Sequence, residues 1–114
     1  MRIKRYASHY LLLPEYGFLK QHAIEIRGEC VVRVFPFSGE PEDMAWYPGV
    51  ILLSGEKADK TQITHLFQFP YNLLSELPGI FQTNVPIQRV VYLLYPFDFD
   101  KMTVSEVTEI SRIG

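Results

Sequence analysis

Residues 22–37 read HAIEIRGECVVRVFPF, and this stretch decides the predicted fold. Apolar and polar side chains alternate on both sides of residues 27–29, with the two-residue period of half-buried strands. The turn Arg27-Gly28-Glu29 is short, and Gly28 can take the positive φ that a tight hairpin turn requires. We therefore predict a β-hairpin over residues 23–37.

Strand-like runs bounded by turn residues continue through most of the 114 residues, which include eight prolines and seven glycines. The pattern predicts further strands over residues 2–13, 18–26, 46–53, 61–69 and 87–97. Strict alternation in the first strand places Tyr6, Ser8, Tyr10 and Leu12 on one face, and Ile3, Arg5, Ala7, His9, Leu11 and Leu13 on the other. In the strand over residues 46–53, Pro48 has no donor, so pairing is expected to begin at Val50.

The remaining segments are less regular. Residues 87–97 are apolar on both faces, which is typical of a central strand. Residues 71–77 are ambiguous, because Asn72 could cap a short helix that Pro78-Gly79 would stop. For residues 98–114 a loop followed by a short strand is favoured over an amphipathic helix. Residues 38–45 read as an acidic connector and residues 54–60 as a surface loop.

Together these elements predict one domain over residues 1–114 with an all-β fold. We expect a small stand-alone β-sandwich or partly closed barrel with at most one or two short helices. The composition agrees with a globular sheet protein, since 47% of the residues are hydrophobic and 14% are aromatic.

The charge and the apolar runs limit the classes of partner. A net charge of −2 with scattered basic residues argues against nucleic-acid binding. No apolar run approaches the ~20 residues of a membrane-spanning helix, and no signal peptide is evident. A soluble cytoplasmic protein with no membrane partner is expected, and the single cysteine, Cys30, excludes an internal disulfide.

Few residues carry recognisable chemistry. His9, His22 and His65 lie in different predicted strands without paired-ligand spacing, so no metal or other cofactor is expected. Cys30 follows a turn and is interpreted as a small buried side chain. Asp98 and Asp100 could hold a cation or act as an acid–base pair, but carboxylates at a strand end more often form turns. No catalytic residue is predicted.

Short motifs in residues 6–53 resemble the small β-sandwich, or composite domain, beside the barrel of amidohydrolase-superfamily enzymes. They are Leu12-Leu13-Pro14, His22-Ala23-Ile24-Glu25-Ile26, Arg27-Gly28-Glu29, Val31-Val32-Arg33-Val34 and Pro48-Gly49-Val50-Ile51. In that family the last motif leads into a barrel with metal-binding histidines, whereas here Leu52-Leu53-Ser54 follow. The resemblance implies the sandwich architecture and carries over no catalytic residue.

The leading functional hypothesis is a non-catalytic protein-interaction or scaffold module, most simply a homodimer or a partner of another protein. Six residues at strand ends and in loops are candidates for its surface: Tyr16, Phe18, Tyr47, Asp98, Phe99 and Asp100. One alternative is a small-molecule-binding or enzymatic domain with an aromatic-lined pocket that uses an aspartate or a histidine. Another is an accessory subunit of a separate hydrolase.

Overall fold

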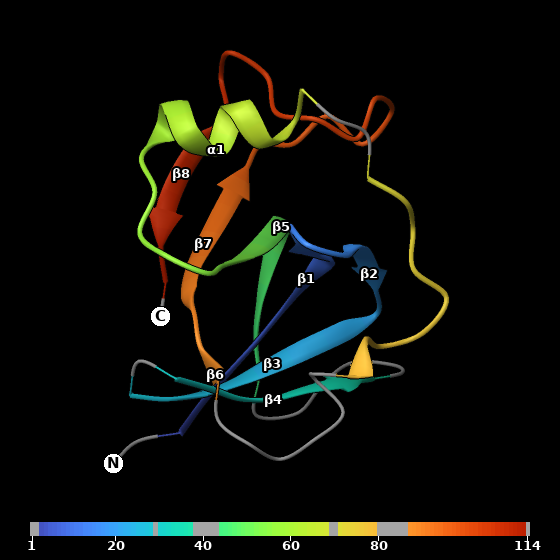
Figure 1. Ribbon diagram of the computed structural model, residues 1–114, viewed down its shortest axis with the longest axis vertical. Coiled ribbons are helices and arrows are strands. Elements are labelled where there is room, and N and C mark those ends of the chain that lie inside the picture. The colour runs from blue at the N-terminus through green and yellow to red at the C-terminus, as the bar shows by residue number, and fades with distance from the viewer. Residues whose placement is uncertain (1–2, 29, 38–43, 69–70, 80–86, 114) are drawn as a thin grey trace.

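The computed structural model describes residues 3–28, 30–37, 44–68, 71–79 and 87–113. These residues form eight strands and one short helix (Figure 1). In chain order they are β1 (Ile3–Leu13), β2 (Gly17–Lys20), β3 (His22–Arg27), β4 (Cys30–Pro36), β5 (Ala45–Ser54), α1 (Lys60–Leu66), β6 (Ile87–Gln88), β7 (Val90–Tyr95) and β8 (Glu109–Arg112). For these residues, the β-dominated fold with at most one or two short helices is confirmed.

All the strands belong to one mixed sheet with the order β6-β4-β3-β1-β5-β7-β8. The β1–β5 pair is parallel and every other pair is antiparallel. β3 pairs with the first half of β1 and β2 with its second half, and Gln21 between them has a φ of 59°. The sheet is strongly twisted, so that β3 and β4 cross the direction of β7 and β8 steeply in Figure 1.

The hairpin predicted over residues 23–37 is confirmed. β3 and β4 pair from His22↔Pro36 to Arg27↔Cys30. Gly28 has a φ of +63°, the left-handed conformation expected for it, whereas Glu29 lies outside the described residues. Alternation buries Ile24 and Ile26 on β3. On β4 the buried residues Val31 and Val34 are three positions apart, because the register shifts between Glu25↔Arg33 and Ile26↔Val31.

The core lies on both faces of the central strands. One cluster contains Leu11, Leu13, Ile51, Leu53 and Val91 and extends to the inner faces of β3 and β4. The opposite cluster contains Leu12, Val50, Leu52, Tyr92 and Leu94 and continues under α1. Double-sided burial confirms a central strand in residues 87–97, although Arg89 divides that segment into β6 and β7.

The strict alternation predicted for β1 is wrong around His9. The β1–β5 register shifts between Ser8↔Tyr47 and Tyr10↔Val50, so His9 alone faces the two residues Pro48 and Gly49. Tyr6 consequently packs in the same cluster as Leu11, an odd number of residues away. The irregularity is a β-bulge, and a bulge changes the phase of alternation in a way that a two-residue period cannot anticipate.

The bulge also explains why pairing begins before Pro48, contrary to the expectation of a start at Val50. β5 already pairs with β1 from Tyr6↔Ala45, and its pairing with β7 begins at Val50. Pro48 falls within the register shift, where it is not required to donate a ladder hydrogen bond.

The strand predicted over residues 61–69 is wrong in the described residues, because Lys60–Leu66 form the helix α1. Asp59 begins it with a capping box: its side chain accepts the Gln62 N–H at 2.8 Å, and the Gln62 side chain accepts the Asp59 N–H at 2.9 Å. Ile63 is fully buried and Leu66 packs on the same core cluster. The i, i+3 spacing of these two residues places both on one side of a helix, whereas in a strand they would point to opposite faces.

Residues 71–77, for which the sequence was ambiguous, form no helix. Leu73 forms an isolated bridge with Phe18. The Phe18 N–H donates to Asn72 O at 2.9 Å, and the Leu74 N–H donates to Phe18 O at 2.8 Å. The loop and short strand predicted at the C-terminal end are confirmed by β8. Most of the predicted acidic connector, residues 38–43, lies outside the described residues. No helix among the described residues is long and apolar enough to cross a bilayer.

Candidate functional site

Aromatic side chains from three parts of the chain meet at the surface beside the bulge. The His9 ring lies 5.2 Å from the Trp46 ring and 5.0 Å from the Phe99 ring, between centroids. Trp46 remains 47% exposed and Phe99 38% exposed, and His9 is exposed as well. We call His9, Trp46 and Phe99 the aromatic patch.

Further rings support the patch from below and from the side. Phe99 contacts Tyr10 at 5.8 Å and the buried Phe97 at 5.3 Å, and Trp46 contacts Phe37 at 6.4 Å. Phe97 in turn packs on Phe18 in the core. The patch is therefore the outer end of a continuous aromatic cluster and not a set of isolated exposed rings.

The bulge fixes the position of His9. Its Nδ1 accepts the backbone N–H of Gly49 at 3.2 Å. Ser8, which is buried, donates to Tyr10 O at 2.6 Å and accepts from Ile51 N at 3.3 Å. Side chains thus satisfy backbone groups at the register shift, and a neutral His9 then carries its proton on Nε2, on the side away from Gly49.

A separate turn fixes Phe99. The Asp98 carboxylate accepts the N–H groups of Asp100 at 3.0 Å and Lys101 at 3.1 Å. The backbones of Asp98 and Thr103 also exchange two hydrogen bonds, of 3.0 and 3.1 Å. Asp98 is accordingly a turn former, as the simpler interpretation of the sequence held. Its carboxylate is occupied by backbone amides, and Asp100 is exposed.

The structure separates the six residues predicted for the surface. Phe99 belongs to the aromatic patch, and Asp98 and Asp100 flank it in the chain. Tyr16 is 41% exposed at the turn between β1 and β2, and Tyr47 is half-buried against Tyr6, with ring centroids 5.6 Å apart. The expectation that Phe18 is exposed is wrong: it is 1% exposed, packed against Tyr10, Tyr71 and Phe97.

Sequence reasoning missed His9 and Trp46. Strict alternation grouped His9 with Leu11 and Leu13, which are buried, and the bulge that turns it outward leaves no periodic signal. Trp46 was assigned to a strand without a role. Two features of the sequence could have singled out Trp46: it is the single tryptophan of the chain, and it lies two residues before a Pro-Gly pair.

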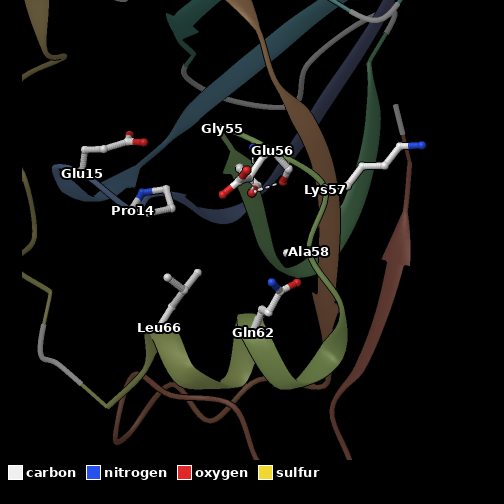
Figure 2. Close-up of a pocket in the computed structure, with 9 residues that line it drawn as sticks. Pro14, Glu15, Gly55, Glu56, Lys57, Ala58, Gln62 and Leu66 are labelled. Carbon is white, nitrogen blue, oxygen red and sulfur yellow. Dashed lines mark hydrogen bonds between the residues drawn. The ribbon is translucent and has the colours of Figure 1, made fainter.

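A recess of about 420 Å³ lies at the other end of β1 and β5 (Figure 2). Three segments form its walls: the turn after β1, the segment after β5, and one side of α1. The lining residues are Pro14, Glu15, Ser54, Gly55, Glu56, Lys57, Ala58, Gln62 and Leu66. Figure 2 shows Gln62 and Leu66 rising from α1 into the recess, with Glu15 and Glu56 on the opposite side and Lys57 pointing away.

Hydrogen bonds hold the recess walls in place. Arg89 Nη1 donates to both carboxylate oxygens of Glu15, at 3.0 and 3.3 Å. The Ser54 hydroxyl donates to Glu56 O at 2.5 Å. The Tyr92 hydroxyl accepts the Ala58 N–H at 3.0 Å. These hydrogen bonds connect all the wall segments except α1 to the rest of the sheet.

The histidines, the cysteine and the acidic residues of the described part of the chain lie apart from one another. They include no group of three or more His, Cys, Asp or Glu side chains placed to hold a metal ion. His22 Nδ1 contacts Lys20 O at 2.9 Å, His65 is exposed on α1, and Cys30 is a free, half-buried thiol. No buried side-chain nitrogen or oxygen in this part of the chain lacks a hydrogen-bond partner.

Two tyrosines have perturbed acidities. Burial, and secondarily the neighbouring Tyr47, raises the pKa of Tyr6 above its ordinary value. Burial, and secondarily Glu15, raises the pKa of Tyr71. Both shifts keep the phenols neutral, which suits packing in the aromatic cluster and the core and does not activate a base.

Three comparisons with known proteins, by family model, by curated sequence and by solved structure, found no match.

Proposed function

We propose that the protein is a non-catalytic protein-binding module that uses the aromatic patch as its contact surface. The observation that carries the proposal is the contact of His9 with both Trp46 and Phe99, because these two large rings remain partly exposed around the same histidine. A soluble domain gains free energy by burying such rings, so leaving them together at the surface favours a role in association.

The chemistry of the patch fits a protein partner. Tryptophan is enriched among the residues that dominate protein–protein binding, and such residues cluster within a surrounding ring of weaker contacts. His9 adds a polar group between the two rings, and an Nε2–H there can donate to a backbone carbonyl of the partner. The patch thus combines apolar area with one orienting hydrogen bond.

The rigidity of the patch adds to the support. His9 is tied to Gly49 N–H, Trp46 belongs to the parallel β1–β5 pair, and Phe99 follows the Asp98 turn. Side chains that are already held in place lose little conformational entropy on binding. A preorganised surface of this kind needs less contact area for a given affinity.

The proposal is tested by comparing Trp46→Ala with Tyr16→Ala in the full chain. Both changes remove a partly exposed ring, and only the first touches the patch. Tagged proteins are expressed in the cells that produce the chain, and bound proteins are identified after mild cross-linking. We expect Trp46→Ala to lose a partner that Tyr16→Ala retains. Equal recovery by the two variants would contradict the proposal, as would a wild-type chain that recovers no partner and does not self-associate.

A further inference from the structure

We propose that the aromatic patch, together with a cluster of arginines on the same face of the sheet, binds an acidic peptide segment. The inference rests on the proposed function and adds the chemistry of the partner. The arginines are Arg5 on β1, Arg27 on β3 and Arg33 on β4, and we call these three residues the basic cluster.

The strand register gathers the basic cluster around one glutamate. Glu25 pairs directly with Arg5 on β1 and with Arg33 on β4, and Arg27 lies two residues further along β3. Residues paired in this way, and residues two apart on one strand, point to the same face of a sheet. Three positive charges therefore surround one negative charge on this face.

Two of the three arginines keep their charge available. Arg5 Nε donates to the Glu25 carboxylate at 2.8 Å, and the Glu25 side chain is only 13% exposed. Arg27 and Arg33 are exposed, and neither has a carboxylate partner in the described part of the chain. The Arg33 guanidinium instead lies 4.3 Å from the centre of the Phe35 ring. The cluster thus offers two unpaired guanidinium groups, the donors best suited to bind carboxylates.

The adjacent row of side chains on the same face connects the basic cluster to Trp46. In this row Phe35 pairs with Ala23, Ala23 with Ala7, and Ala7 with Trp46. Phe35 precedes the arginine row by two residues on β4, as Ala7 does on β1. With strands ~4.8 Å apart and ~3.3 Å per residue along each strand, Arg33 lies roughly 15 Å from Trp46. About five extended residues cover that span, so one short segment can reach both.

The number of available charges favours a peptide over a nucleic acid. Nucleic-acid binding rests on neutralising many phosphates, whereas the basic cluster leaves two guanidinium groups unpaired and the whole chain has a net charge of −2. An acidic peptide needs carboxylates only at the basic cluster, and its apolar side chains can then pack against the aromatic patch.

The test is a fluorescence titration of the full chain, because Trp46 is its single tryptophan and lies in the proposed surface. The probe is the blocked peptide acetyl-Glu-Ser-Glu-Ser-Leu-Ser-Leu-amide, which carries its glutamates and leucines on one side when extended. The same peptide with glutamine in place of glutamate is the uncharged control, and an oligothymidylate represents nucleic acid.

The protein variants separate the basic cluster from net charge. The double variant Arg27→Gln/Arg33→Gln removes the two unpaired guanidinium groups. Lys57→Gln/Lys60→Gln is the matched control, because it removes two positive charges at exposed positions outside the basic cluster.

We expect a saturable change of Trp46 fluorescence with the acidic peptide and a dissociation constant on the order of a millimolar, which weakens as salt is added. The glutamine peptide should bind at least about fivefold more weakly, and so should the acidic peptide to the arginine double variant, whereas the lysine double variant should bind it as the wild type does.

Four results would overturn the inference: no saturable change, equal binding of the two peptides, equal losses in the two double variants, or tighter binding of the oligothymidylate than of the acidic peptide. None of them contradicts the proposed function, which is decided separately by whether Trp46→Ala loses a partner that Tyr16→Ala retains.

Discussion

Gly49 lies where β5 passes between His9 and the backbone of β7. Its φ is +105°, and a Cβ at this position would stand 2.3 Å from Leu94 O. Its N–H also donates to His9, so the residue joins the core to the aromatic patch. The Pro48-Gly49 pair that resembled a family motif in the sequence thus has a physical role in this chain: it permits the bulge that turns His9 outward.

We predict that Gly49→Ala lowers the free energy of unfolding by about 2–4 kcal/mol, because it adds backbone strain and a steric clash. Gly79→Ala is the control, since no atom lies within 4 Å of the added Cβ. That change should stay within about 0.5 kcal/mol. Urea unfolding of both variants measures the difference. Similar midpoints for the two variants would show that β5 does not approach β7 this closely.

At the scale of elements, regular strands were predictable and their interruptions were not. The hairpin over residues 22–36 followed from alternation and one glycine, because adjacent antiparallel strands are determined locally. The parallel contact of β1 with β5 joins segments more than thirty residues apart in the chain, and its bulge depends on that contact. The exposed position of His9, and with it the patch, could therefore not be read from periodicity.

The helix α1 shows how a local signal can be present and still be outweighed. Alternation of Ile63, His65 and Phe67 suggested a strand, whereas Asp59 followed by Gln62 forms a capping box. The recess depends on this choice, because in the helix Gln62 and Leu66 lie about one turn apart and both face the segment after β5. The cap is thus the sequence feature that determines whether the recess exists.

We predict that Asp59→Ala lowers the free energy of unfolding by about 1 kcal/mol, because the Gln62 N–H loses its capping acceptor. The fully buried Ile63 couples the helix to the core, so the loss should appear in global unfolding. Asp59→Asn retains a capping oxygen and should lose much less. Thermal or urea unfolding followed by circular dichroism compares the two variants. Equal losses would indicate that the cap does not hold α1 in place.

For the whole molecule, the exposed edge and the aromatic patch raise the question of self-association. β8 ends the described sheet with four residues, and its charged Glu109 and Arg112 are features that discourage pairing with a further strand. The patch has no such protection, since its neighbours Phe37 and Tyr10 extend the aromatic surface. If two copies meet, the patch is the more favourable surface, and a two-fold axis through it would bring each copy's Trp46 toward the other.

We predict a two-fold homodimer that forms at micromolar concentration and buries at least ~1,000 Å² of total surface. Trp46→Ala should shift the equilibrium to the monomer, because the largest ring of the patch, which is 47% exposed, would lose its contact area, whereas Tyr16→Ala should leave it unchanged. Sedimentation velocity over a range of concentrations makes the comparison. A single species near 13.3 kDa at every concentration would exclude the dimer. In that case the patch would have to serve a different protein, and the cross-linking comparison of Trp46→Ala with Tyr16→Ala would become the deciding measurement.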